Sequence, residues 1–160
     1  MSVAPEDFKL ALRQWTSGIS IVTAENDGEH HGMTVSAFGS VSLAPPLISV
    51  CLAADARVVE LVTASRRFAV SVLASHQAEI SDRFATYPDE GRFEGQGFVE
   101  GADGCRLIEG ALAHIECNVY SAHEAGDHVV LIGRVQHCSA AEGVPLLYFG
   151  GGYGVFQPQP

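Results

Sequence analysis

The sequence predicts a mainly β protein, a small barrel with a few helices packed outside it. β-branched or alternating segments recur at short spacing and are separated by turn signals such as Asn26-Asp27-Gly28 and Gly126-Asp127. We expect about three helices and about six strands, mostly linked as hairpins. The chain has 160 residues, 47% of them hydrophobic, and no repeat or composition break. It should therefore fold as a single domain over residues 1–160.

The first predicted element is a helix that begins at Pro5, a residue suited to a first helical turn. Phe8, Leu12 and Trp15 follow at helical spacing and form one apolar stripe, and Gly18 ends the pattern. We expect this helix to pack on the barrel. Truncation of Trp15, the only tryptophan, to Ala would then cost about 3 to 5 kcal/mol.

The central stretch of the chain is Gly32 to Leu52, which follows a first strand at 19–24. If residues 33–42 form one strand, their side chains alternate between two faces. Hydroxyl groups and one aromatic ring then share a face, namely Thr34, Ser36, Phe38, Ser40 and Ser42. This face suits either solvent or a polar, planar ligand. The apolar run at 47–52 predicts a neighbouring strand buried on both sides, which favours a ligand site.

The chain next changes to helical spacing. Val58, Leu61 and Val62 predict a helix over 57–64, with Asp55 placed to cap its N-terminus. This helix begins where the buried strand ends.

Residues 68–73 alternate as a strand, and a third helix is expected from an N-cap at Ser75 through Phe84. A glycine-rich stretch at 87–104 predicts a long loop, and loops of that length are often functional. Alternation and turn signals then predict the remaining strands at 111–120, 128–138 and 146–149.

The net charge of −10 argues against binding to nucleic acid or to an anionic membrane surface. An anionic cofactor would need a local cation or helix end. The start of the chain lacks the basic and apolar regions of a signal peptide, and no apolar run approaches the roughly 20 residues that span a bilayer. We therefore expect a soluble, cytoplasmic protein.

The cysteines and histidines do not form a metal motif. Cys51, Cys105, Cys117 and Cys138 have no CxxC spacing and suit reduced, buried thiols. The histidines other than His128 have no spacing typical of a metal site and are assigned to the surface or core. No metal ligand is predicted.

The segments GMTVSAF at 32–38 and SVSLAPPLISVCL at 40–52 resemble the flavin reductase-like family, the short FMN- or FAD-binding split-barrel proteins that reduce free flavin with NADH or NADPH, often for a partner monooxygenase. Other segments match that family in order and spacing, among them FAVSVL at 68–73, GALAHIEC at 110–117, GDH at 126–128 and PLLYFGGGYG at 145–154. The resemblance covers nearly the whole chain. It implies an FMN-binding split β-barrel of Greek-key type with a few peripheral helices, and a homodimer with its flavin site at the subunit contact.

A flavin needs hydrogen-bond partners along its ring edge, a cation or helix end for its phosphate, and an open face for the nicotinamide. The resemblance implies ring contacts at Thr34, Val35, Ser36 and Ala37, with Ser40 and Ser42 beyond them. It implies further flavin contacts at Cys51, Leu52, Ala53, Asp55, Arg57 and Phe84. Exposed amides at the helix start and the charge of Arg57 suit a phosphate, although alanines stand where family members often have Asn, Ser or Thr.

The resemblance also implies a nicotinamide site. Its residues are His128 of the GDH motif and the C-terminal group Gly150, Gly151, Gly152 and Tyr153. These glycines are not a Rossmann fingerprint, because no helix follows them.

The function implied is NAD(P)H:flavin oxidoreduction, in which hydride passes from nicotinamide C4 to flavin N5 and no catalytic base is needed. One alternative is a flavin-binding protein that shares the fold without turnover. A second is a related oxidase acting on a phosphorylated pyridine vitamer, which would need a stronger basic cluster than Arg57, Arg66 and Arg67. The sequence leaves open FMN or FAD, and NADH or NADPH.

Overall fold

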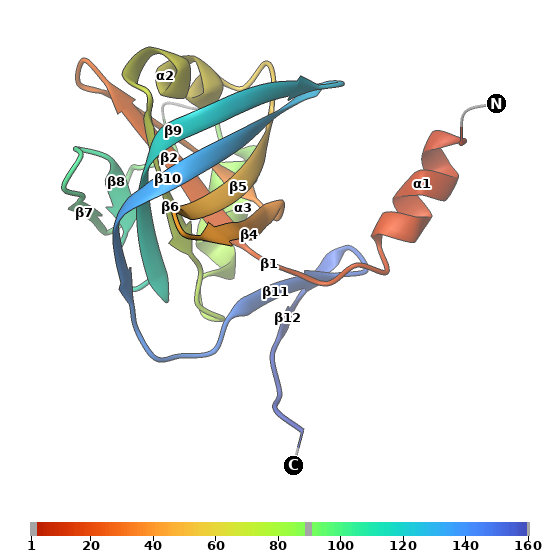
Figure 1. Cartoon of the computed structure of the whole chain (residues 1–160). Helices are drawn as coiled ribbons and strands as arrows, with labels where there is room; N and C mark the ends of the chain where they lie inside the picture. Colours follow the sequence, from red (N-terminus) through yellow and green to blue (C-terminus); the bar gives the residue numbers. More distant parts are fainter. Residues whose placement is uncertain (1–2, 89–90, 160) are drawn as a thin grey trace.

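The structure, a computed structural model, describes residues 3–88 and 91–159. Its centre is one curled antiparallel sheet of seven strands, in the order β3-β2-β6-β9-β10-β5-β4 (Figure 1). These strands are β2 Ser20–Asn26, β3 Glu29–Val35, β4 Phe38–Leu43, β5 Pro46–Ala53, β6 Arg67–Val72, β9 Ala113–Ala125 and β10 His128–Ala140. β3 and β4 are therefore neighbours in sequence but lie at the two edges of the sheet.

Smaller elements surround this sheet. The helices are α1 Pro5–Leu12, α2 Arg57–Ser65 and α3 Ala78–Thr86, and the short strands are β1 Ser17–Gly18, β7 Phe98–Glu100, β8 Arg106–Ile108, β11 Leu146–Phe149 and β12 Gly152–Val155. The mainly β class and the three helices are confirmed. The strand count was wrong, because the described residues form twelve strands rather than about six. Strands of two to four residues are too short to leave a periodic signal.

Two predicted hairpin turns are confirmed. Asp27 and Gly28 join β2 to β3 with φ of 52° and 83°, which is the positive φ that a two-residue hairpin turn requires and that Gly and Asp tolerate. Gly126, with φ of 66°, starts the two-residue turn between β9 and β10.

The core consists of two main apolar clusters. In the first, Val58, Leu61 and Val62 of α2 pack against Phe68 and other buried side chains of the sheet, and α2 covers one end of the barrel (Figure 1). In the second, Phe84 of α3 packs with buried side chains from the three sheets, namely Ile21, Ile108 and Leu146, and from the segments between strands, namely Ile19, Leu73 and Ala111. The two helices predicted after residue 52 thus bury their apolar faces as expected.

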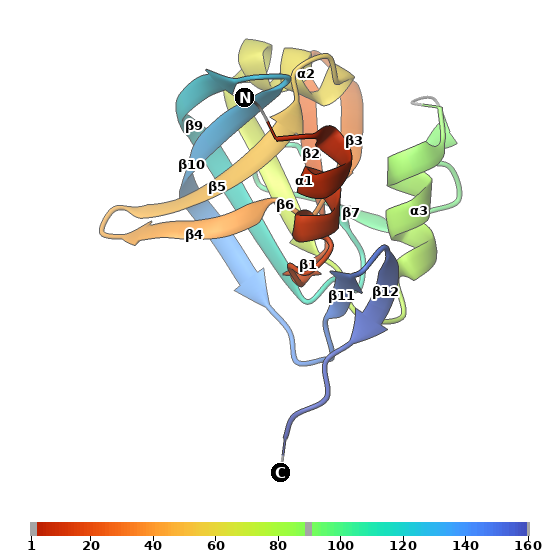
Figure 2. The same ribbon diagram turned by 90° about the vertical axis from the view of Figure 1, so that its right-hand side faces the viewer.

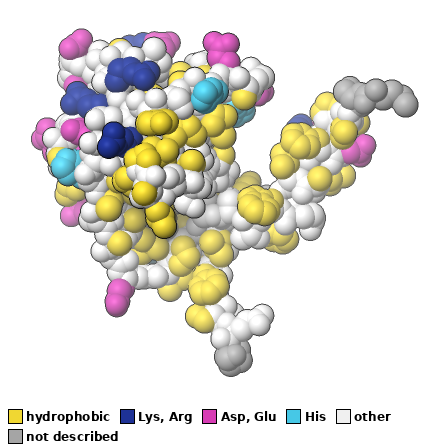
Figure 3. All heavy atoms as spheres, in the orientation of Figure 1, with side chains coloured by type: hydrophobic (Ala, Val, Ile, Leu, Met, Phe, Trp, Pro, Cys, Tyr) yellow, Lys and Arg dark blue, Asp and Glu magenta, His cyan; other side chains and the backbone are white. Residues whose placement is uncertain are grey.

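The first helix does not pack on the barrel. α1 has no buried residue, Trp15 is 74% exposed and Phe8 is 57% exposed. The helix projects away from the sheet and carries hydrophobic side chains on its surface (Figures 1 and 3). It ends at Leu12 and not at Gly18, which lies in β1. The predicted 3 to 5 kcal/mol contribution of Trp15 to folding of one chain is therefore wrong.

The predicted strand at 33–42 is broken at Ser36 and Ala37. Before the break, Val35 pairs with Ser20 of β2. After it, Phe38 pairs with Val50 of β5. The chain thus crosses from one edge of the sheet to the other, so the five side chains at 34, 36, 38, 40 and 42 do not share one strand face.

The strand at 46–53 is buried on one side only. Ile48, Val50 and Leu52 are buried, while the side chains between them are half-buried, so the prediction of burial on both sides is wrong. Its neighbours β10 and β4 pair with it on either edge.

Two predicted helix caps are wrong. Ala56, not Asp55, is the N-cap of α2, and Gln77, not Ser75, is the N-cap of α3; neither makes a side-chain capping bond. Gln77 instead accepts a hydrogen bond from the Ala74 amide and donates to the Glu109 carbonyl.

The loop predicted at 87–104 contains β7, and its residues 89 and 90 lie outside the described part of the chain.

All cysteines are free, but they are not all buried. Cys105 and Cys117 are buried, whereas Cys138 is exposed. Burial raises the pKa of the Cys105 thiol to about 11 and that of Cys117 to about 12. Both thiols are therefore protonated, and unreactive, at neutral pH.

In a titration of the folded protein with a chromogenic disulfide reagent, we expect the exposed Cys138 to react fastest and the half-buried Cys51 to react more slowly. Cys105 and Cys117 should react only after addition of denaturant, because their thiolates are suppressed and their sulfurs are covered. A Cys138→Ser variant is the control and should lose the fast phase. A fast phase of equal amplitude in that variant would contradict the assignment.

None of the helices in the described ranges 3–88 and 91–159 is long and apolar enough to cross a membrane.

Candidate functional site

Four adjoining hollows follow the end of β3 and the crossing at 36–37. The α2 pocket, about 360 Å³, is lined by His31, Met33, Thr34, Asp55, Ala56, Arg57, Phe84, Ala85 and Arg92. The hairpin pocket, about 380 Å³, is lined by Ile19, Thr34, Ser36, Ser81, Asp82, Ala85, Tyr148, Gly151, Gly152 and Tyr153. Thr34 and Ala85 belong to both pockets. The two hollows are therefore in contact across the end of β3.

Two further hollows open on the other side of Ser36. The α1 groove, about 540 Å³, is lined by Lys9, Leu12, Arg13, Trp15, Ser17, Ser36, Ala37, Tyr148, Gly150 and Gly151. A smaller one of about 220 Å³ lies between Trp15, β1 and Phe38. Ser36 lines the α1 groove, the hairpin pocket and this smaller hollow. Ser36 is thus shared by three of the four hollows, and Thr34 links them to the α2 pocket.

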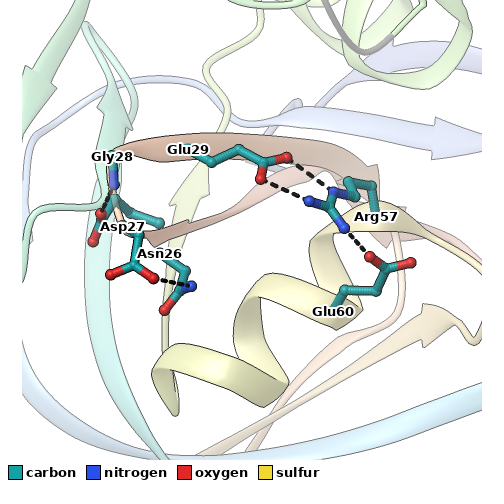
Figure 4. Close-up of polar contacts among 7 residues, drawn as sticks. Asn26, Asp27, Gly28, Glu29, Arg57 and Glu60 are labelled. Carbon is teal, nitrogen blue, oxygen red and sulfur yellow. Dashed lines mark hydrogen bonds and ion pairs between the residues drawn. The ribbon is translucent and has the colours of Figure 1, made fainter.

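Arg57, which lines the α2 pocket, forms an ion-pair network with Glu29 and Glu60 (Figure 4). Arg57 donates from Nε to Glu29 Oε1 at 2.9 Å and from Nη2 to Glu29 Oε2 at 2.6 Å, a bidentate pair. Arg57 also pairs with Glu60 one turn along α2. The hydrogen bond from Arg57 lowers the pKa of Glu29. The Arg57 cation is therefore already engaged by two carboxylates.

Arg92 forms another part of this pocket and comes from the loop after α3. Its Nη1 donates to the Gly32 carbonyl at 2.7 Å and its Nε to the Tyr87 carbonyl at 2.9 Å. Gly32 leaves room for Phe84, because a Cβ at position 32 would lie 2.8 Å from Phe84 Cε1. Close packing and two backbone bonds thus fix the guanidinium relative to β3.

Hydroxyl groups connect three elements at the hairpin pocket. Thr34 donates to the Ser81 carbonyl at 2.6 Å. The Tyr153 hydroxyl lies 2.9 Å from Ser81 Oγ and 2.6 Å from Asp82 Oδ1. Partial burial, and then the Asp82 carboxylate, raise the pKa of Tyr153, so the phenol stays protonated and donates at neutral pH. These bonds hold the β11–β12 hairpin against α3.

The glycines at the tip of that hairpin have a conformational reason. Gly150 and Gly151 have φ of 64° and 97°, a region that side chains disfavour. The Gly150 amide donates to the Arg13 carbonyl at 3.1 Å. This bond links the glycine turn to the segment after α1, and both Gly150 and Arg13 line the α1 groove.

The structure brings most predicted flavin and nicotinamide residues around this line of hollows. Thr34, Ser36, Ala37, Asp55, Arg57, Phe84, Gly150, Gly151, Gly152 and Tyr153 all line at least one of them. Phe84 is buried and serves as part of the core as well as the pocket wall. The Val35 side chain is buried in the core, its carbonyl accepts a hydrogen bond from Ser20 Oγ at 3.2 Å, and Val35 lines none of the four hollows.

Other predicted residues lie elsewhere. The hollows described above are not lined by Ser40, Ser42, Cys51, Leu52, Ala53 or His128. Ser40 and Ser42 flank a register shift in β4, and Leu52 is fully buried.

His128 lies at the exposed tip of the β9–β10 hairpin and pairs across the sheet with Ala53. Its Nδ1 lies 2.7 Å from Asp127 Oδ1, and this contact lowers the pKa of Asp127. Within one chain, none of the four hollows described above is lined by both His128 and the glycine turn.

Sequence reasoning missed Ser81, Asp82, Tyr148 and Arg92. Ser81 and Asp82 were hidden within a helical pattern, and their partners lie about 70 residues away in β12. For Arg92 a signal existed, because it falls in the long loop that was expected to be functional. Distance in sequence is what conceals such contacts.

Comparisons with known proteins agree with this architecture. Residues 12–157 match the family model described as "Flavin reductase like domain". A flavin-dependent monooxygenase reductase subunit, HsaB, of Mycobacterium tuberculosis is 34% identical over 160 residues, covering 98% of this chain and 85% of the relative. An NADH-dependent flavin reductase of a Rhodococcus species is 36% identical over 157 residues, covering 94% and 86%.

Solved structures show the same fold. The NADH:FAD oxidoreductase SgcE6 of Streptomyces globisporus superposes with a TM-score of 0.88 at 34% identity, covering 99% of this chain and 98% of that one. Nitrilotriacetate monooxygenase component B of Mycobacterium thermoresistibile gives 0.91 at 33% identity, covering 96% and 87%. The predicted split β-barrel is thereby confirmed. From the matched family model and these relatives, the chain belongs to the flavin reductase-like family.

Proposed function

We propose that this protein reduces FMN or FAD with NADH or NADPH and releases the reduced flavin to a partner monooxygenase. The observation that carries the proposal is the line of hollows centred on Thr34 and Ser36, with guanidinium groups at one end and a glycine turn at the other. Relatives named as flavin reductases and as monooxygenase reductase components support it. The family match over 12–157 also supports one domain over 1–160.

The residues present fit a flavin. The crossing at 36–37 offers backbone groups between small side chains, with Ala37, Gly150 and Gly151 leaving space for a planar ring. When bound, the flavin supplies the hydride-accepting centre. The chain's part is to bind and orient. Thr34 and Tyr153 fix the walls through Ser81, and Arg57 lies in the pocket where a phosphate is expected.

The function is tested by following oxidation of NADH and of NADPH with FMN and with FAD in turn. Consumption in at least one pairing is expected, and the preferred pairing identifies the flavin and the nicotinamide. Riboflavin serves as the phosphate-free comparison. If neither NADH nor NADPH were consumed with either flavin, the proposed activity would be wrong, and the alternative of a flavin-binding protein without turnover would remain.

We also propose that the protein is a homodimer whose flavin site is completed by the partner chain. Apolar side chains that a single chain leaves exposed include Phe8, Leu12, Trp15 and Leu43, the last 96% exposed. α1 projects from the barrel rather than covering its own chain (Figure 1), and Figure 2 views the molecule from the side on which the helix projects. His128 lies outside the hollows of its own chain, so we assign it to the nicotinamide site of the other subunit.

Replacement of His128 by Ala should raise the Michaelis constant for NADH or NADPH about tenfold, as expected for one lost hydrogen bond of about 1.4 kcal/mol. Flavin affinity should change little, because the proposed flavin contacts lie on β3 and α2. Steady-state kinetics and flavin titration on the same variant separate the two constants. His137→Ala, another exposed β10 histidine, is the control. A variant that loses flavin but keeps its nicotinamide constant would show that the two ligands are misplaced.

A further inference from the structure

The β11–β12 hairpin carries the glycine turn of the proposed nicotinamide site, but little buried surface holds its outer strand in place. β12 is the edge strand of the small sheet and pairs with β11. All four residues of β12 are exposed. An edge strand with so little buried surface has a low free energy of local opening. The position of the turn therefore depends on the contacts that the hairpin makes with other elements.

Tyr153 is the residue of β12 that reaches α3. Its hydroxyl lies 2.6 Å from Asp82 Oδ1 and 2.9 Å from Ser81 Oγ. A phenol has one proton to donate, and the shorter contact is to a carboxylate, so Tyr153 donates to Asp82. The Ser81 hydroxyl then donates to the phenol oxygen. Partial burial raises the pKa of Tyr153, the bond with Asp82 raises it further and the bond with Ser81 lowers it, as this direction of the two bonds requires.

The Tyr153 ring also packs inside the hairpin. It meets the ring of Tyr148 edge to face, with centroids 5.8 Å apart and an interplanar angle of 65°. Tyr148 lines the hairpin pocket together with Gly151 and Gly152. A bond that holds the phenol against α3 therefore also holds the aromatic pair beside the glycine turn.

The same turn of α3 contacts the strand of the proposed flavin site. Thr34 of β3 donates to the Ser81 carbonyl at 2.6 Å, and Ser81 is fully buried. Two consecutive residues of α3 thus contact both the flavin strand and the nicotinamide hairpin. Hydride transfer needs its reacting atoms about 3 to 3.5 Å apart, and a misplacement of about 1 Å can cost about 100-fold in rate. An element that contacts both sides can fix that spacing.

We propose that Asp82 is a positioning residue of the reductase, which holds the Tyr153 phenol, and through it the glycine turn, at a fixed distance from the strand that contains Thr34. This inference rests on the proposed flavin reductase function. Thr34 bonds to the main chain of α3 and not to the Asp82 side chain. Loss of the Asp82 carboxylate should therefore displace the nicotinamide side of the site and leave the flavin side in place.

The test compares Asp82→Ala, Asp82→Asn and Tyr153→Phe by steady-state kinetics and flavin titration. Asp82→Ala should lower kcat/KM for NADH or NADPH about tenfold, the change that corresponds to one lost hydrogen bond to a charged acceptor, and should leave the dissociation constants of FMN and FAD within about twofold. Asp82→Asn should recover most of the loss, because an amide oxygen still accepts the phenol proton. Glu79→Ala, which removes another exposed acid of α3, is the control for the change in charge.

The double variant of Asp82→Ala and Tyr153→Phe shows whether the two groups act as one unit. If Asp82 acts through the phenol, the double variant should lose no more than the more affected single variant. Additive losses would show that Asp82 acts by another route and would overturn the inference. Amide exchange in β11 and β12, measured without ligand, should be faster in both single variants and unchanged in Glu79→Ala.

The flavin titration separates positioning from folding. Equal losses of flavin affinity and of kcat/KM in Asp82→Ala would mean a structural role and would overturn the inference. Kinetic constants and amide exchange equal to those of Glu79→Ala would overturn it as well, while the reductase function remained. If the unmodified protein consumed neither NADH nor NADPH with either flavin, the proposed function would fail and this inference with it.

Discussion

Replacement of Gly133 by Val should lower the free energy of unfolding by about 3 kcal/mol or more, the upper range for overpacking a core. A Cβ at this position of β10 would lie 2.5 Å from Phe68 Cζ and 2.8 Å from Cys117 Cβ. Both neighbours are buried. The strand pair β9–β10 also shifts register between Ile132 and Gly133, so the backbone there is already fitted around Phe68.

Urea unfolding of Gly133→Val measures this loss. Gly154→Val is the matched control, because a Cβ at position 154 meets nothing within 4 Å. A Gly133→Ala variant combined with Phe68→Leu should be more stable than the sum of the two single changes predicts, since the shorter side chain removes the clash. An unfolding midpoint for Gly133→Val equal to that of the unmodified protein would contradict the packing argument.

Replacement of Trp15 by Ala should weaken the proposed dimer while leaving the fold of each chain intact. Trp15 is 74% exposed within one chain and lines the α1 groove. A buried interface tryptophan typically contributes about 2 kcal/mol or more, which corresponds to a rise of about 30-fold in the dimer dissociation constant. Circular dichroism should show the fold unchanged.

Sedimentation equilibrium over a range of protein concentrations measures that constant. Tyr120→Ala is the control, because Tyr120 is an exposed aromatic of β9, 58% exposed, outside the α1 segment. Equal association of Trp15→Ala and the unmodified protein would remove α1 from the interface. An unmodified protein that remained monomeric with flavin present would remove the dimer itself.

The local features of the fold could be predicted from sequence. Asp27 and Gly28 signal a hairpin because their turn depends on adjacent residues. The stripe of Val58, Leu61 and Val62 predicts α2 for the same reason. Thr34 and Ser36 could be predicted as site residues because the segment GMTVSAF that contains them resembles the family closely.

Features that depend on distant partners could not be predicted. An apolar stripe around Trp15 shows that a surface needs covering, but not which chain covers it. The pairing of Arg57 with Glu29 joins residues 28 positions apart, and no local pattern in the sequence indicates it. The break at Ser36 arises because Phe38 pairs with Val50 of β5, which alternation alone does not show.

That crossing at Ser36 and Ala37 links two strands which are consecutive in the chain but lie at opposite borders of the sheet. A ligand seated there touches the seam along which the barrel is open. Its binding free energy then adds to the resistance of both border strands against fraying. If the proposed flavin binds there, we expect release of the reduced flavin to make β3 and β4 exchange their backbone amides faster, so that product release and local opening of the sheet edges are linked.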